Sequence, residues 1–159
     1  LDMLLMSPMP RRRIVAEKFV SMVPDVVFIS LATYVSVVVG TILIEESIDL
    51  YWLAILHLVS IPYLLACVAF GLVLSVALES ARRAQILAFA GVGVMYMLDS
   101  LTRETDYELL GDLMFPRYFD PASVLISNDV ELIDISILVV VTMVLLFVAA
   151  TLFERADIS

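Results

Sequence analysis

Apolar residues in this chain are gathered into four long runs, at about 22–44, 52–78, 85–101 and 132–153. An α-helix that crosses a bilayer needs about 20 predominantly apolar residues, and the runs reach or approach that length. The pattern therefore predicts an all-α fold, a polytopic transmembrane helix bundle with four spans.

The segment between the third and fourth runs, residues 102–131, is too long for a simple turn. It places apolar residues at helical spacing, interrupted by Gly111, Pro116 and Pro121. Asp120 can cap a helix whose first residue is Pro121. We expect short amphipathic helices here, lying at the outer membrane interface.

Composition places the chain in the membrane class. Its 159 residues are 62% hydrophobic and 17% charged, with a mean hydropathy of +1.05. The net charge is −9, and the acidic residues stand mainly between the apolar runs. A nucleic-acid partner would need clustered basic surface, so none is expected. The lone Cys67 permits no intrachain disulfide.

The basic residues predict an orientation, because lysine and arginine near span ends remain cytoplasmic. With four spans and a cytoplasmic amino end, seven basic residues lie inside and two, Arg103 and Arg117, lie outside. The seven are Arg11, Arg12, Arg13, Lys18, Arg82, Arg83 and Arg155. We predict a multi-pass protein of the cell membrane with both termini cytoplasmic.

The sequence contains only weak matches to the residue patterns that are typical of catalytic sites. His57 is the only histidine and has no carboxylate at helical spacing, which favours a packed or interfacial role. Glu45 and Glu46 form an acidic pair in a loop, without the arginine and histidines of an intramembrane protease. There is no nucleophile elbow and no phosphate-binding loop. The sequence does not favour an enzyme, and we expect no metal or cofactor on this chain.

Two carboxylates lie within the apolar runs, where charge is costly and often functional. Asp25 follows Pro24 early in the first run, and Asp99 is near the outer end of the third. Each is close enough to a membrane boundary for solvation, which is the favoured interpretation. The alternative is that one of them lines a substrate path.

The chain begins with a basic, proline-punctuated stretch, "SPMPRRRIVAEKFV", at residues 7–20. Proline fits the first turn of a helix, so we expect a helix that runs from Arg11 into the first span. Residues 1–21 would then form a cytoplasmic loop and interfacial helix, and residues 22–159 the transmembrane domain.

This stretch resembles the P-x-x-R-x-x-(I/V)-(I/V)-x-x-K segment of ABC-2 type transporter permeases. The matching positions are Pro8, Arg11, Ile14, Val15 and Lys18. "YFDP" at residues 118–121 and "FERADI" at 153–158 are similar to family segments before the last span and at the end, with Ala156 in place of an arginine.

The resemblance implies that the four spans correspond to the third through sixth of a six-span permease, with two spans absent. It implies a dimer of permease copies and export driven by a separate ABC ATPase subunit, on which ATP and Mg²⁺ would bind. Contact with that ATPase is implied for the first cytoplasmic loop and for the second, "LESARRAQ". The residues concerned are Leu4, Leu5, Pro8, Arg11, Lys18, Arg82 and Arg83. The alternative is a four-span membrane scaffold or accessory subunit, whose basic front only sets topology.

Overall fold

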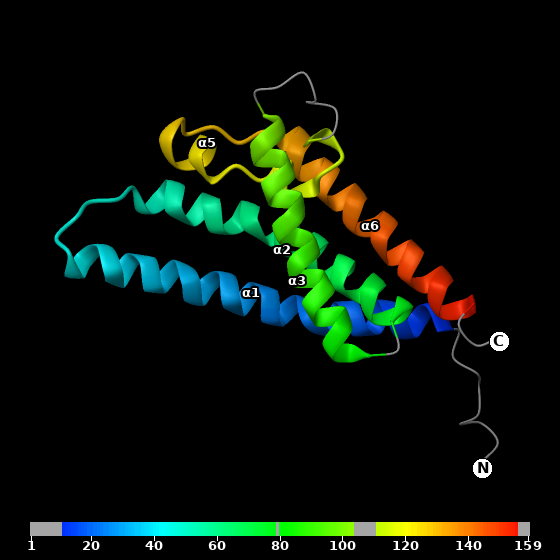
Figure 1. Ribbon diagram of the computed structural model, residues 1–159. Helices are drawn as coiled ribbons and strands as arrows, with labels where there is room; N and C mark the ends of the chain where they lie inside the picture. The colour runs from blue at the N-terminus through cyan, green and yellow to red at the C-terminus, as the bar shows by residue number, and fades with distance from the viewer. Residues whose placement is uncertain (1–10, 79, 104–110, 156–159) are drawn as a thin grey trace, which may run out of the picture.

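The computed structural model describes residues 11–78, 80–103 and 111–155, with the backbone alone described at Arg11. Every regular element in these ranges is helical, which confirms the all-α prediction (Figure 1). The elements are α1 (Arg11–Leu43), α2 (Leu50–Ala77), α3 (Ala81–Thr102), η2 (Phe115–Tyr118), α5 (Pro121–Ile126) and α6 (Leu132–Arg155).

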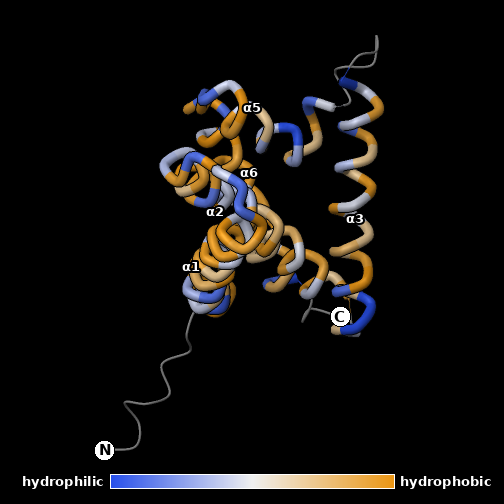
Figure 2. The backbone as a smooth tube through the Cα atoms, turned by 90° about the vertical axis from the view of Figure 1, so that its left-hand side faces the viewer, coloured by the Kyte–Doolittle hydropathy of each residue, from blue (hydrophilic) through white to orange (hydrophobic). Residues whose placement is uncertain are grey.

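Four of these helices, α1, α2, α3 and α6, are long and apolar enough to cross a membrane. Their large apolar side chains are mostly exposed, and the tube in Figure 2 is apolar along most of their length. A helix with apolar residues on all sides is stable where lipid surrounds it. The chain is therefore a multi-pass membrane protein.

Helix α1 is continuous from the basic stretch through the first apolar run. Its 33 residues extend about 50 Å at about 1.5 Å per residue, whereas the hydrocarbon core is about 30 Å thick. The expected helix from Arg11 into the span is confirmed. Part of α1 must therefore lie beyond the hydrocarbon core, unless the helix is strongly tilted.

Helix α2 is central: it packs against α1, α3 and α6. The backbone of α3 approaches α2 and η2 but, over the described residues, neither α1 nor α6 (Figure 2). One core cluster, built around Val15, Leu72 and Ala149, joins α1, α2 and α6. A second, built around Ala66, Phe115 and Leu138, joins α2 and α6 to η2.

The start of α3 differs from the sequence prediction, which placed "LESARRAQ" in a loop. Only Leu78 and Ser80 are described outside a helix there, and α3 begins at Ala81. The Ser80 hydroxyl accepts a hydrogen bond from the Arg83 amide, which satisfies a backbone donor of the first turn. Arg82 and Arg83 therefore stand on the first turn of a helix.

The contact between α2 and α3 depends on a small residue. A Cβ atom at Gly91 would lie 3.0 Å from Cε1 of Phe70, whereas a Cβ atom at Gly93 would meet nothing within 4 Å. The two glycines are two positions apart on the same helix. They form a matched pair for testing how closely α3 packs on α2.

Gly91→Ala and Gly93→Ala should therefore have different effects on stability. Each substitution stabilises the helix by up to about 1 kcal/mol, because alanine has a higher helix propensity than glycine. Only Gly91→Ala must also displace the Phe70 ring, and overpacking of this kind costs about 1–3 kcal/mol. Unfolding in mixed micelles should find Gly91→Ala less stable than Gly93→Ala by at least about 1 kcal/mol. Equal stabilities would contradict the close packing.

In the described part of the segment before α6, residues 111–131, η2 and α5 are short helices, as predicted. Asp120 precedes α5 and accepts a hydrogen bond from the Ala122 amide at 3.0 Å, with Pro121 as the first helical residue. The predicted cap is thus confirmed. Aromatic rings fix η2 to α2: Tyr63 stacks on Phe119 at a centroid distance of 5.0 Å, and Phe115 is buried.

Candidate functional site

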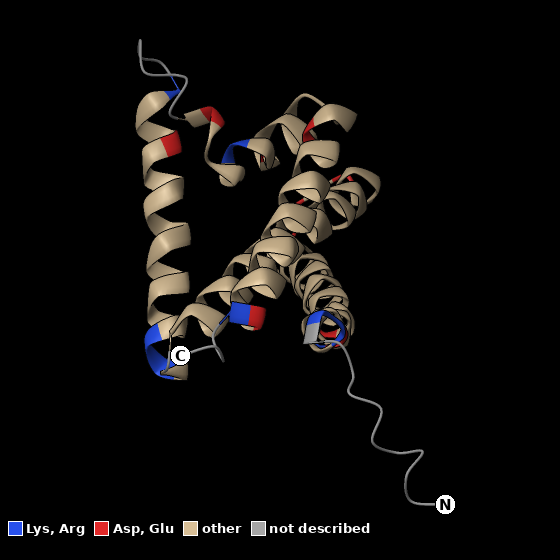
Figure 3. Ribbon diagram, turned by 90° about the vertical axis from the view of Figure 1, so that its right-hand side faces the viewer, with Lys and Arg blue, Asp and Glu red and all other residues tan. Residues whose placement is uncertain are grey.

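Most of the residues proposed to contact an ATPase lie at one end of the bundle. The start of α1, the start of α3 and the end of α6 carry arginine or lysine at this end, which we call the basic end (Figure 3). The opposite end carries Arg103 and Arg117 among several carboxylates. The amino and carboxyl ends of the described chain thus share one side, as four spans require.

The structure brings part of the predicted set together. Lys18 lies beside the start of α3, where it lines a groove with Ala81 and Gln85. Arg82 and Arg83 are exposed on the adjacent turn. Arg11 opens α1. The predicted positions Leu4, Leu5 and Pro8 lie outside the described residues.

The sequence analysis missed an ion pair that joins the first and last helices. Arg12 donates to Glu154 from Nε at 2.7 Å and from Nη2 at 3.1 Å, although the residues are 142 positions apart. Both side chains are substantially exposed, at 64% and 38%, so the pair orients the helices more than it stabilises them. Val15 and Ala149 are buried nearby on the same two helices.

At the opposite end, Asp99 was expected to be solvated, and that expectation is wrong. Its side chain is 2% exposed, and η2 packs against α3. Its Oδ2 accepts from Nε of Arg103 at 3.0 Å, and its Oδ1 lies 3.9 Å from Nη1 of Arg117. The longer distance is an ion pair without a direct hydrogen bond.

These charges form a network that we call the α3 lock: Asp99, Arg103, Asp112, Arg117 and Asp120. Arg103 also contacts Asp120 at 3.3 Å, and Nε of Arg117 lies 3.0 Å from Oδ1 of Asp112. The lock links the end of α3 to η2 and to the cap of α5. A buried carboxylate held by two arginines has its charge compensated, which is typical of a structural role.

Asp120 both caps α5 and belongs to the α3 lock. Burial alone would raise the pKa of its carboxyl, but hydrogen bonds from the Ala122 amide, Arg103 and Ser123 outweigh that effect. The pKa of Asp120 is therefore held below its usual range. The carboxylate of Asp120 remains charged throughout neutral and mildly acidic conditions.

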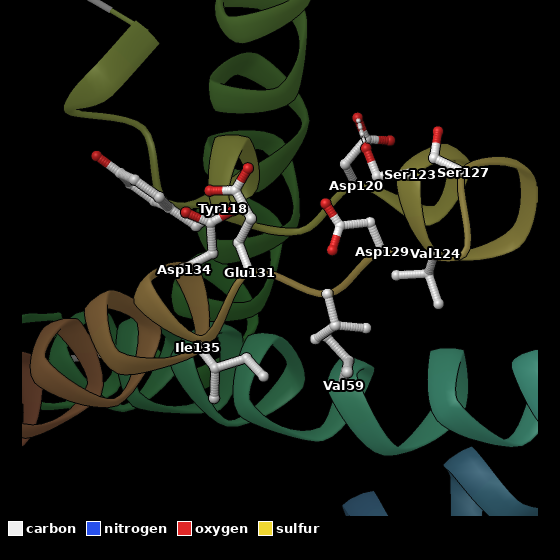
Figure 4. A pocket seen from close by; sticks show the side chains of 11 residues that line it. Val59, Tyr118, Asp120, Ser123, Val124, Ser127, Asp129, Glu131, Asp134 and Ile135 are labelled. Carbon is white, nitrogen blue, oxygen red and sulfur yellow. Dashed lines mark hydrogen bonds between the residues drawn. The ribbon is translucent and has the colours of Figure 1, made fainter.

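A small hollow of about 160 Å³ lies beside the lock, between α2, α5 and the start of α6. Figure 4 shows Val59 projecting into it from α2, with the carboxylates of Asp129, Glu131 and Asp134 on the other side. The hollow is acidic because four carboxylate side chains, Asp120, Asp129, Glu131 and Asp134, are among the residues that line it. No group of three or more metal-ligating side chains with suitable geometry occurs among the described residues.

The remaining candidate residues, Asp25, His57, Glu45 and Glu46, lie outside the α3 lock. Asp25 is exposed on α1, so it does not line an enclosed path in a single copy of the chain. His57 is half-buried: its Nδ1 lies 2.9 Å from the Leu53 carbonyl, and its ring packs edge-on against Tyr34. The packed interpretation of His57 is confirmed. Glu45 and Glu46 are exposed in the turn after α1.

No protein-family model, curated protein or solved structure matches this chain.

Proposed function

We propose that this chain is a membrane-spanning subunit of an ABC-2 type exporter, working with a second permease copy and a separate ABC ATPase. The observation that carries the proposal is the continuity of α1. One unbroken helix begins at Arg11 of the family-like segment and continues through the whole first apolar run. A force applied at its start passes along this one helix toward the centre of the bundle, through Pro24, where one backbone hydrogen bond is missing.

Orientation supports the same proposal. The basic end holds Arg12, Arg13, Lys18, Arg82, Arg83 and Arg155, and the opposite end holds Arg103 and Arg117. Under the positive-inside rule the basic end faces the cytoplasm, where an ATPase would be. Both segments that the resemblance assigns to the ATPase, the start of α1 and the start of α3, lie at this end.

The packing suggests which parts move. The start of α1 is tied to α6 by Arg12 and Glu154 and to α2 by the core around Val15, so these three helices form one body. Within the described residues, helix α3 is attached to that body through α2, through η2 and through the ion pair of Arg103 with Asp120 at the cap of α5. ATP-driven closure of the ATPase would shift the first body against α3, moving the bundle between two access states.

Exchanging the charges of Arg12 and Glu154 tests this coupling. Tagged full-length chain is first captured from native membranes to identify the ATPase, and both are reconstituted together. Wild-type chain should stimulate ATP hydrolysis. Arg12→Glu and Glu154→Arg should each lower that stimulation at least about fivefold, the lower end of allosteric coupling, and the double exchange should restore it.

Arg13→Glu is the matched control, because it reverses a charge in the same stretch but faces Glu17 on its own helix at 2.7 Å. It should retain most of the stimulation. A wild-type chain that neither binds nor stimulates any ATPase would overturn the transporter proposal and leave the four-span scaffold. Stimulation that is unchanged in both single variants would overturn the role of the pair.

A further inference from the structure

A groove of about 360 Å³ lies at the basic end between α1 and α3, with α2 as its floor. Lys18 and Met22 form one wall, Ala84 and Gln85 are on the other, and Gly71 belongs to the floor. The backbones of α1 and α3 do not contact each other there (Figure 2). At about 30 Å³ per molecule, the groove has room for about a dozen waters, far more than one bound ion requires.

The lining of the groove changes from polar to apolar with depth. Ser75 lies near the end of α2, and Val68 lies two helical turns deeper. On α3, Ala81 and Gln85 are close to the helix start, and Ala88 is about 10 Å from Ala81 at 1.5 Å per residue. The polar side chains therefore stand at the surface, and the deeper walls are hydrocarbon.

Positive charge lies at the polar mouth and next to it. Lys18 lines the groove, and Arg82 and Arg83, which are not among the lining residues, follow the lining residue Ala81 on the first turn of α3. Within the described part of the chain, none of these three forms an ion pair. The amino end of α3, a helix of 22 residues, adds the positive end of its dipole. The groove thus offers a cationic mouth above an apolar channel.

We infer that this groove binds one anionic phospholipid from the leaflet at the basic end. Lys18, Arg82 and Arg83 hold the headgroup phosphate, and an acyl chain lies between α1 and α3 on Gly71 and Leu72. Water would be a poor filling for apolar walls at that depth, whereas a lipid matches both the charge and the change of polarity. The inference is independent of the proposed transport function.

Lipid retention by the purified full chain tests this site. The chain is placed in nanodiscs of phosphatidylcholine with a minor fraction of phosphatidylglycerol, then released and weighed by native mass spectrometry. One phosphatidylglycerol should remain bound. Arg82→Gln with Arg83→Gln should weaken its binding about thirtyfold, the fold-change expected for two basic residues near an anionic headgroup. Lys18→Gln alone should weaken it about fivefold.

Arg13→Gln with Arg155→Gln is the matched control, because it removes the same charge from exposed positions at the same end. It should leave retention nearly unchanged; equal losses in the two double variants would overturn the specific site. Ser75→Phe keeps the charge but fills the groove mouth, and it should also release the lipid.

A second arm separates a lipid from a free anion. In lipid-free detergent, inorganic phosphate should raise the thermal unfolding temperature much less than phosphatidylglycerol does. An equal rise would overturn the lipid assignment, as would a second copy of the chain occupying the groove in cross-linking through Ser75→Cys. Helix content from circular dichroism checks that each variant is folded.

Discussion

Asp99→Asn should destabilise the bundle by about 3 kcal/mol. Removing one member of a buried ion pair costs about 3–5 kcal/mol, because the remaining charge is left without compensation. Asp99 is 2% exposed, but its partner Arg103 is 41% exposed and can turn toward water, so we expect the lower end of that range. Unfolding of the purified chain in mixed micelles, followed by circular dichroism, measures the change.

Asp25→Asn is the control for Asp99→Asn. It makes the same chemical change on another span, at an exposed position. Surface substitutions of this kind usually alter stability by no more than about 0.5 kcal/mol. If both variants were equally stable, the α3 lock would contribute nothing. If Asp99→Asn had wild-type stability but abolished transport, Asp99 would belong to the substrate path instead.

Loss of the α3 lock should first increase local opening at the end of α3, before it affects the rest of the bundle. Helix α3 is held by α2 along one face and by η2 at its end, with no further helix behind it in the described residues. Local opening follows the weakest set of contacts. Hydrogen exchange should therefore increase at the end of α3 and in η2 before it increases in α2 or α6.

The spans could be predicted from sequence because lipid imposes one simple requirement, a long apolar helix. The ends of the helices could be predicted less well. The proline before Arg11 predicted the start of α1, but hydropathy did not indicate that α3 continues as a helix beyond its apolar run, through Arg82 and Arg83. The Ser80 cap, not hydropathy, determines where α3 begins.

Some polar contacts could likewise be predicted from the sequence, and others could not. Asp120 and Pro121 are adjacent, so their cap could be predicted from the sequence, whereas the i,i+4 pair of Asp99 and Arg103 was not predicted. Neither motif revealed that Asp99 would be buried. The pairing of Arg12 with Glu154 depends on how four helices pack, and no local spacing carries that information.

Gly111→Ala is the second substitution with a large expected effect. A Cβ atom at residue 111 would collide with Nη1 of Arg117 and lie 2.7 Å from the hydroxyl oxygen of Thr102. A shift of the guanidinium would disturb its contacts with Asp99 and Asp112, so the new methyl group should weaken the α3 lock. We expect a loss of about 2 kcal/mol, within the usual range for overpacking. Gly40→Ala, where a Cβ atom meets nothing within 4 Å, should instead be neutral or stabilising.

A double-mutant cycle decides whether Gly111 acts through the α3 lock. If the added methyl group is harmful because it displaces Arg117 from Asp99, part of its effect disappears once Asp99 is already asparagine. Gly111→Ala should then cost at least about 1 kcal/mol less in the Asp99→Asn background than in the wild type, the size of coupling seen between residues in one network. Strictly additive losses would show that Gly111 supports the turn by another route and that Arg117 is not the link between the two positions.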